Sequence, residues 1–303
     1  MTPNFLIAGT PKSGTTSLYH YLWQHPEVFL STPKEPHFFS SQCIKLPVRD
    51  YKGASNAIRF INHWNEYEDL FNKSEGYKAI GEASTDTFYY SESIDHIKSH
   101  LGDPKIILLL RNPVDRLISQ FRHQKRECME PLSLQEALME EQNRINDNYA
   151  VGYHYSALGF YAERLAQYQQ AFSNIHLIFF EDLKNHPVEV MREVFQFLEI
   201  DTSFSPDIST VFNPAGKPKI KWVHDFFYSK SKVRDWLRPV FSIFLSPEKR
   251  FRIMEDIKNK NLKKDSIEIA DEIRQSLITL YKNDILQLQN LTRRDLSSWL
   301  KLK

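Results

Sequence analysis

The segment at residues 105–110, KIILLL, constrains the fold more than any other part of the chain. A strand with one solvent-facing side alternates apolar and polar residues, whereas this run has no alternation after its first lysine. Such a run is typical of a central parallel strand whose two faces are both covered by other elements. The sequence therefore predicts a buried parallel sheet, and parallel strands require crossover helices between them.

Short apolar runs alternate with helical patterns along most of the chain, as this fold requires. Further strands are predicted at 5–8, 79–82 and 175–180, and helices at 17–24, 64–71, 91–100, 113–128, 133–146, 154–171 and 187–198. The stretch 26–76 is expected to be irregular apart from its one helix. The pattern is helical again from 267 to 300, where the expected core contacts are Leu277, Leu280, Ile285 and Leu288.

The predicted fold class is therefore α/β, with a central parallel sheet between layers of helices and a helical C-terminal part. We expect a single domain over residues 1–303, with a core at about 4–221 and a helical extension at about 222–303. The sequence does not predict the oligomeric state.

The composition excludes several classes of partner. Lys and Arg total 39 against 38 Asp and Glu, so the net charge of +1 gives no general attraction to nucleic acid or to an anionic membrane. The apolar runs are far shorter than a membrane span, and no secretion signal precedes the first strand. With only Cys43 and Cys128, we expect a reducing, cytoplasmic setting, with a pairing of the two thiols as the alternative.

A glycine-containing loop, GTPKSGTTS at 9–17, lies between the first predicted strand and the first predicted helix. Backbone N–H groups and a helix N-terminus near Gly14 form an anion site of the P-loop type, and Lys12 adds a positive charge. In kinases and ATPases the lysine follows the second glycine, where this chain has Thr15. The alternative is a tight turn that binds no ligand. The hydroxyl groups that could contact the anion belong to Ser13, Thr15, Thr16 and Ser17.

A second anion site is predicted in LLLRNPVDRLISQF at 108–121. Arg111 follows the central strand and Ser119 lies two turns into the next helix, at the sheet edge where open α/β folds bind ligands. Arginine and a serine hydroxyl make a natural phosphate clamp, although a lone arginine is more often an ion-pairing or capping residue, as we expect for Arg116 with Asp115. Two anion sites on one edge predict a ligand with two separated phosphates.

The motifs PKSGTTSL and RNPVDRLISQF resemble the 5′-phosphosulfate loop and the 3′-phosphate motif of sulfotransferases that use 3′-phosphoadenylyl sulfate (PAPS). The segment HPEVFLSTPKEPHFFS, Gly81-Glu82 with Tyr89-Tyr90, and the helix with His123 resemble the heparan sulfate sulfotransferase branch and its bacterial relatives. The resemblance runs, with gaps, over 5–221. It implies transfer of a sulfuryl group to a hydroxyl or amine of a carbohydrate or small-metabolite acceptor, with release of adenosine 3′,5′-bisphosphate (PAP) and without a metal.

The resemblance also implies roles for individual residues. Lys12 matches the lysine that stabilises the leaving phosphate, and Glu35 in KEPHFF matches the glutamate base. Burial beside Phe38 and Phe39 would raise the pKa of such a glutamate, and Lys34 would lower it. The alternative is that Glu35 is an ordinary solvated acid.

His123, one helical turn after Ser119, matches a histidine near the sulfuryl group and is expected to be a transition-state donor or an alternative base. Glu82 matches an acid of related enzymes, but Ala83 stands where their lysine follows, so Glu82 is expected to be a substrate contact or part of a buried ion pair. His37 is expected to be structural or to line the substrate site.

The late segment NPAGKPK resembles in composition the Gly/Lys/Arg-containing segment with which sulfotransferases close the cofactor site. The resemblance implies that Lys217 or Lys219 contacts the 3′-phosphate, with a solvated turn as the alternative. Two other functions compete with sulfuryl transfer. A P-loop nucleotide kinase or NTPase needs a lysine at Thr15 and an aspartate for Mg²⁺ at a strand end, and neither is evident. A non-catalytic nucleotide- or glycan-binding protein would not need both Lys12 and Glu35. The sequence has no metal-ligand spacing of His, Cys or carboxylates.

Overall fold

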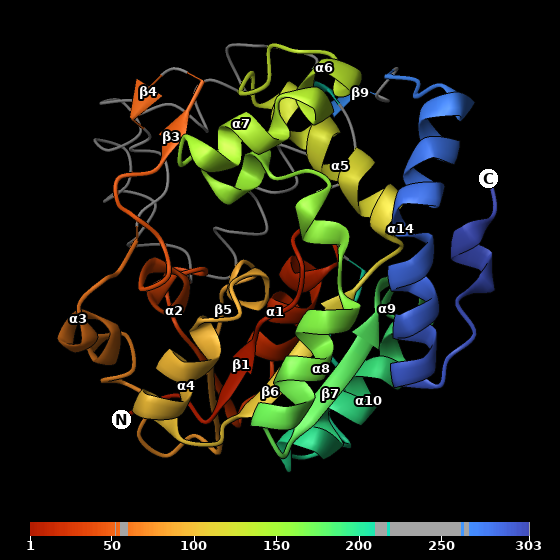
Figure 1. The fold of residues 1–303 in the computed structure, drawn as a ribbon. Coiled ribbons are helices and arrows are strands. Elements are labelled where there is room, and N and C mark those ends of the chain that lie inside the picture. Colours follow the sequence, from red (N-terminus) through yellow and green to blue (C-terminus); the bar gives the residue numbers. More distant parts are fainter. Residues whose placement is uncertain (52, 55–59, 210–216, 219–261, 264–266, 303) are drawn as a thin grey trace.

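The computed structural model describes residues 1–51, 53–54, 60–209, 217–218, 262–263 and 267–302. A five-stranded parallel sheet in the order β2-β5-β1-β6-β7 lies at the centre of the described part (Figure 1). Its strands are β1 (Phe5–Ile7), β2 (Val28–Leu30), β5 (Ala79–Ala83), β6 (Lys105–Leu110) and β7 (Ile175–Phe179). Leu6 of β1 pairs with Glu82 on one side and with Ile106 on the other. The predicted parallel sheet is confirmed.

The helices follow the predicted alternation with strands. Within the described residues the α-helices are, in chain order, α1 (Thr15–Trp23), α2 (Phe38–Ser41), α3 (Trp64–Asp69), α4 (Ser93–Leu101), α5 (Pro113–Arg126), α6 (Leu134–Met139), α7 (Glu141–Asn146), α8 (Ala162–Ala171), α9 (Phe180–Asn185), α10 (Pro187–Leu198) and α14 (Asp271–Thr292). Among the residues that the structure describes, no helix is both long and apolar enough to cross a membrane.

Different helices cover the two faces of the sheet. Ile106 and Leu108 of β6 pack into a core with α4, α5, α8 and α14, whereas Ile107 and Leu109 pack into a second core with α1 and α10. Because successive side chains of a strand point to opposite faces, every position of β6 from Ile106 onward is buried. The three-layer arrangement is thus the physical reason for the unalternating run KIILLL.

The stretch 26–76 contains more regular structure than predicted. It holds the edge strand β2, the short helix α2, and two-residue strands β3 (Arg49–Asp50) and β4 (Gly53–Ala54), which pair with each other. The segment VFL of β2 is only three residues long and follows α1 closely. Elements this short carry too few residues for periodicity to separate them from a loop.

The predicted helix at 154–171 is wrong in its first half, because α8 begins only at Ala162. The preceding residues form 3₁₀ turns at Val151–Tyr153 and Ala157–Gly159. The carboxylate of Asp284 on α14 accepts hydrogen bonds from the backbone N–H groups of Tyr161 and Ala162, at 2.8 and 3.0 Å. This distant side chain fixes the start of α8, and local sequence contains no sign of it.

The C-terminal part packs against the sheet layer through α14. Leu277, Ile285 and Leu288 are buried as predicted, but Leu280 is 47% exposed, so its expected core contact is wrong. Tyr281, the next residue, takes the buried position, and its hydroxyl donates to the carbonyl of Ser156 at 2.9 Å. Helical spacing alone allowed either residue to face the core.

We expect Gly9→Ala to lower the free energy of unfolding by about 3 kcal/mol, at the upper end of the cost of overpacking. A Cβ at Gly9 would lie 2.3 Å from the backbone nitrogen of Leu109 in β6, where no side-chain rotation can relieve the contact. Gly76→Ala is the matched comparison, because Gly76 has a φ of +87° and no neighbour within 4 Å, so it tests backbone strain alone at about 1 kcal/mol. Urea unfolding measures both, and equal losses would contradict the predicted clash.

Candidate active site

The loop at 9–17 connects the carboxyl end of β1 to the N-terminus of α1, as predicted. The backbone N–H of Thr10 donates to the carbonyl of Leu109 at 2.9 Å, which ties the loop to β6. The hydroxyls of Thr10 and Ser13 lie 2.6 Å apart, and Gly14 caps α1 in the left-handed conformation with a φ of 92°. Thr15, Thr16 and Ser17 form the first turn of α1, so their backbone N–H groups lie at the positive end of the helix dipole.

Arg111 lies beside this loop. Its Nη1 donates to the backbone carbonyl of Lys12 at 2.9 Å, and its guanidinium carbon lies 4.3 Å from the centre of the Phe180 ring. Ser119 is half-buried on α5, two turns after the helix begins. The two segments predicted to bind phosphates therefore meet at one edge of the sheet, and Arg111 also supports the conformation of the loop.

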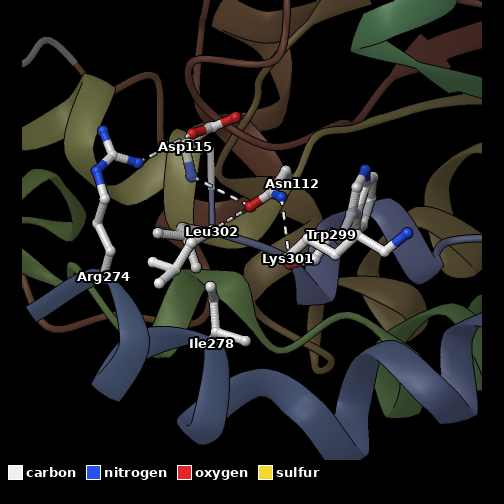
Figure 2. A pocket seen from close by; sticks show the side chains of 8 residues that line it. Asn112, Asp115, Arg274, Ile278, Trp299, Lys301 and Leu302 are labelled. Atoms are coloured by element: carbon white, nitrogen blue, oxygen red, sulfur yellow. Dashed lines mark hydrogen bonds and ion pairs between the residues drawn. The ribbon is translucent and has the colours of Figure 1, made fainter. Parts of the chain in front are cut away.

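Arg116 and Asp115 do not form the ion pair that the sequence suggested. Arg116 is fully buried and donates to the carbonyl of Tyr155 and to Oε1 of Gln120. Asp115 lies 3.6 Å from Arg274 of α14 instead (Figure 2). Consecutive residues of a helix point about 100° apart, which separates these two side chains.

A small pocket between α5, α14 and the C-terminal segment lies next to Asp115 and Arg274 (Figure 2). Asn112 lines this pocket, and its side-chain oxygen accepts hydrogen bonds from the backbone N–H groups of Val114 and Asp115. Its amide nitrogen lies 3.5 Å from the carbonyl of Trp299. The side chain of Asn112 thus caps α5 and contacts the C-terminal segment. None of the residues predicted to contact a phosphate lines this pocket.

Lys12 has the electrostatic environment of a functional lysine. Burial, followed by the charges of Arg126 and Arg111, lowers its pKa from 10.5 to about 8, against the opposing effects of Glu127 and Glu35. Its φ of 69° is left-handed, a conformation that non-glycine residues rarely adopt. Such strain is concentrated at functional sites in proteins. The charges of the predicted base and of the predicted arginine therefore both act on this lysine.

Glu35 is not buried against Phe38 and Phe39 as expected. Its side chain is 33% exposed and pairs with Lys34, and its Oε2 lies 3.7 Å from Nε2 of His37. The two phenylalanines begin α2 and pack into the core, whereas Glu35 and His37 have left-handed φ angles of 60° and 58° before the helix starts. Glu35 thus lies between the expected neighbour Lys34 and a second basic group, His37, which the sequence did not predict as its neighbour.

His37 has a partner that no sequence signal revealed, Asp86. The Nδ1 of His37 lies 2.9 Å from both carboxylate oxygens of Asp86. Burial alone would lower the pKa of His37, but the charge of Asp86 and its hydrogen bond outweigh burial and raise that pKa from 6.5 to about 9. His37 is therefore an imidazolium at neutral pH, and its positive charge faces Glu35.

Glu82 is buried at the end of β5. The hydroxyl of Ser84 donates to its Oε2 at 2.8 Å, and the backbone N–H of His37 donates to that same hydroxyl at 3.0 Å. Burial raises the pKa of Glu82 from 4.5 to about 8, against the hydrogen bond from Ser84 and the charge of His37. Glu82 is thus largely protonated at neutral pH and connects β5 to the turn that carries Glu35.

We expect Glu82→Gln to remove a pH dependence of stability. Because the pKa of Glu82 is raised in the folded state, its contribution to stability is complete below about pH 4.5 and is lost as the pH rises through about 8. The free energy of unfolding of Glu82→Gln should therefore gain on the wild type by up to about 1.4 kcal/mol per pH unit across this window. Urea unfolding at several pH values measures the difference, and parallel curves would contradict a buried, protonated Glu82.

His123 lies in the last turn of α5 with Arg126, and Glu127 is the C-cap of this helix. Nη2 of Arg126 is 2.7 Å from Nδ1 of His123, and Nε of Arg126 is 2.9 Å from Oε1 of Glu127. Burial, followed by the charges of Lys12 and Arg126, holds the pKa of His123 well below its ordinary value. Sequence reasoning missed Arg126, although its spacing of seven residues from Ser119 and three from His123 places all three on one face of a helix.

Of the two lysines predicted in the late segment, the structure describes one. Lys217 lies in β8 (Lys217–Pro218), which pairs with β9 (Leu262–Lys263), and Lys219 lies outside the described residues. Cys43 and Cys128 are free thiols, so the alternative of a disulfide between them is wrong. Within the described part of the chain, no group of three or more His, Cys, Asp or Glu residues could hold a metal ion.

Comparison with known proteins adds independent information. The model of the sulfotransferase domain family matches residues 2–242. The crystal structure of a sulfotransferase from Alicyclobacillus acidocaldarius is similar over 99% of this chain and 100% of that chain, with a TM-score of 0.76 and 28% sequence identity.

Curated relatives are similar over part of their length. Carbohydrate sulfotransferase 15 of Mus musculus is 29% identical over 250 residues, covering 65% of this chain and 44% of that protein. The bifunctional heparan sulfate N-deacetylase/N-sulfotransferase 4 of Mus musculus is 26% identical over 220 residues, covering 70% of this chain and 24% of that protein. The membrane-associated sulfotransferase kil1 of Dictyostelium discoideum is 35% identical over 120 residues, which are 39% of this chain and 22% of that protein. The chain thus spans less than half the length of these relatives.

Proposed function

Because the chain belongs to the sulfotransferase domain family, we propose that it transfers the sulfuryl group of PAPS to a hydroxyl or amine of a carbohydrate or small-metabolite acceptor. The observation that carries this proposal is the contact between Arg111 and the carbonyl of Lys12, which joins two anion-binding segments at one sheet edge. PAPS has phosphate groups on the 5′ and 3′ sides of its ribose, and a site with two separate anion-binding segments suits such a ligand.

The loop at 9–17 would hold the 5′ side of the nucleotide. The N-terminus of α1 and the donors of Ser13, Thr15, Thr16 and Ser17 suit the phosphate that carries the sulfuryl group. Lys12 lies two residues before the second glycine of the loop, whereas the lysine of kinases and ATPases follows that glycine. In this position the side chain of Lys12 would contact the oxygen that links phosphorus to sulfur in PAPS. This placement supports PAPS over ATP as the ligand.

Arg111 and Ser119 would hold the 3′-phosphate. Arg111 follows β6 directly, and its guanidinium is fixed from one side by the ring of Phe180 and from another by the loop carbonyl. A pre-oriented guanidinium loses little side-chain entropy when it binds a phosphate. Lys217 and Lys219 remain candidates for the same phosphate.

Glu35 and Lys12 would act on opposite ends of the bond exchange in the transfer step. The acceptor oxygen or nitrogen forms a bond to sulfur while the bond between sulfur and the 5′-phosphate oxygen breaks. Glu35 takes the proton that the acceptor loses, and Lys12 neutralises the charge that develops on the leaving phosphate. The influence of the charge of Glu35 on Lys12 supports their placement around one reacting group.

The named relatives support a carbohydrate acceptor, because carbohydrate and heparan sulfate sulfotransferases are among them. Glu35 pairs with Lys34 and lies near His37, whose charge is balanced by Asp86, so this part of the site combines two acids with two basic groups.

We expect PAP to raise the melting temperature of the protein, and ATP with Mg²⁺ to raise it much less. A ligand present at 100 times its dissociation constant stabilises the folded state by about 2.7 kcal/mol, which is a shift of several degrees in a thermal scan. Differential scanning fluorimetry with both nucleotides measures this directly. Stabilisation by ATP with Mg²⁺ alone would reject the proposed function in favour of a nucleotide kinase or NTPase.

A further inference from the structure

The arrangement of Arg126 and His123 determines where the imidazole carries its proton. Nη2 of Arg126 lies 2.7 Å from Nδ1 of His123, a distance typical of a charge-assisted hydrogen bond. A guanidinium has only donors, so Nδ1 must be the acceptor. A neutral imidazole that accepts through Nδ1 carries its proton on Nε2, and Nε2–H is then the one polar hydrogen that this ring can offer.

Arg126 is itself held in place. Its side chain is 8% exposed, and its Nε donates to Oε1 of Glu127 at 2.9 Å. That same Oε1 lies 3.9 Å from Nδ1 of His123, farther than a hydrogen bond reaches. Glu127 therefore orients Arg126, and Arg126 orients the histidine.

The other charges that act on His123 also favour the neutral ring. The positive charges of Lys12 and Arg126 both add to the effect of burial in lowering the pKa of His123. Glu127 is the nearby acid, and its carboxylate is bound to Arg126. At neutral pH the ring is therefore uncharged, next to the lysine that serves the leaving group.

We propose that Arg126 is a positioning residue that fixes His123 as an Nε2–H donor, so that His123 hydrogen-bonds to the sulfuryl group rather than accepting the proton of the acceptor. This inference rests on the proposed function and separates two roles that the sequence left open. To act as a base, the ring would have to accept the proton at Nδ1, or first move its own proton from Nε2 to Nδ1 so that Nε2 could accept. In either case a proton on Nδ1 would face an N–H of Arg126. Glu35 is then the residue that takes the proton.

The tautomer can be measured without any turnover. ¹⁵N NMR of the apo protein and of its PAP complex distinguishes the two ring nitrogens, and the spectrum of His123→Gln assigns the signals of His123. We expect Nδ1 without a proton and Nε2 with one, unchanged from about pH 6 to pH 8. In Arg126→Met we expect a mixture of tautomers and a ring that titrates closer to its ordinary range, and in Arg126→Lys the wild-type tautomer. Protonation at Nδ1 in the wild type, or no change in Arg126→Met, would overturn the inference.

Activity provides a second test that does not depend on the folding of the arginine variants. Loss of one transition-state donor lowers kcat by about 10²- to 10³-fold, which we expect for His123→Ala. Glutamine can donate from its amide but cannot act as a base, so His123→Gln should exceed His123→Ala by about tenfold or more. Equal losses would reject the donor role. PAP binding by the wild type is measured in parallel, so a failure of the proposed function is recognised separately from a failure of this inference.

Discussion

Lys12→Met lowers the rate of sulfuryl transfer by about 10³-fold, because the charge on the leaving 5′-phosphate loses its stabilising cation. Methionine has nearly the length of lysine and lacks its charge, so the shape of the loop is preserved. The measurement is transfer of labelled sulfur from PAPS to an acceptor selected from a panel of glycans and small hydroxyl compounds. Lys125→Met is the control, since Lys125 lies further along α5 and donates to the carbonyl of Pro131.

The same substitution should make the protein more stable. The pKa of Lys12 is lowered to about 8 in the folded state, so its charged form is disfavoured there and the protein is destabilised below this pH. At pH 7 we expect Lys12→Met to raise the free energy of unfolding by about 1–3 kcal/mol. A variant that is inactive and more stable cannot owe its inactivity to unfolding. An active Lys12→Met protein would remove Lys12 from the mechanism.

Glu35→Gln lowers kcat by about 10²- to 10⁴-fold, the usual contribution of a general base. Glutamine keeps the size of the side chain and cannot take a proton from the acceptor. The dissociation constant of PAP should change by no more than about threefold, because the proposed role of Glu35 is to take a proton from the acceptor and not to contact the phosphates. Glu66→Gln, at an exposed position on α3, is the matched control.

Wild-type turnover in Glu35→Gln would show that another group takes the proton. The histidine beside Glu35 is His37, whose Nε2 lies 3.7 Å from Oε2 of Glu35 and which Asp86 holds as an imidazolium. A protonated His37 cannot act as a base at neutral pH. His123, with its Nδ1 bound to Arg126, would then be the next group to consider, and the tautomer measurement addresses it directly.

The parts of the fold that were predicted correctly are those with strong local patterns. β6, α5 and α10 were each located within two residues, because a long apolar run or an amphipathic helix that begins with proline is a clear signal. The start of α8 was misplaced because it depends on Asp284, more than a hundred residues later in the chain. β2 was missed because three residues do not establish a period.

In the candidate site, too, local sequence patterns predicted some features and not others. The strand ends at β1 and β6 predicted that Lys12 and Arg111 would lie together, since carboxyl ends of neighbouring parallel strands share one edge. The partners of the charged residues were not predictable. Asp86 reaches His37 only because the turn after β5 lies beside the turn before α2, and Glu35 pairs with Lys34 instead of lying against the phenylalanines. Local spacing predicts which segments meet, but side-chain pairing depends on tertiary packing.

The central claim is that one sheet edge binds a nucleotide with separate 5′ and 3′ phosphates, and isothermal titration calorimetry with PAP and with adenosine 5′-monophosphate tests it most directly. We expect the wild type to bind PAP at least about 100-fold more tightly, since charge-assisted hydrogen bonds to the second phosphate contribute about 3 kcal/mol. Arg111→Lys should reduce this preference by about tenfold, because lysine lacks the planar fork of donors. Equal affinity of the wild type for the two nucleotides would contradict the account.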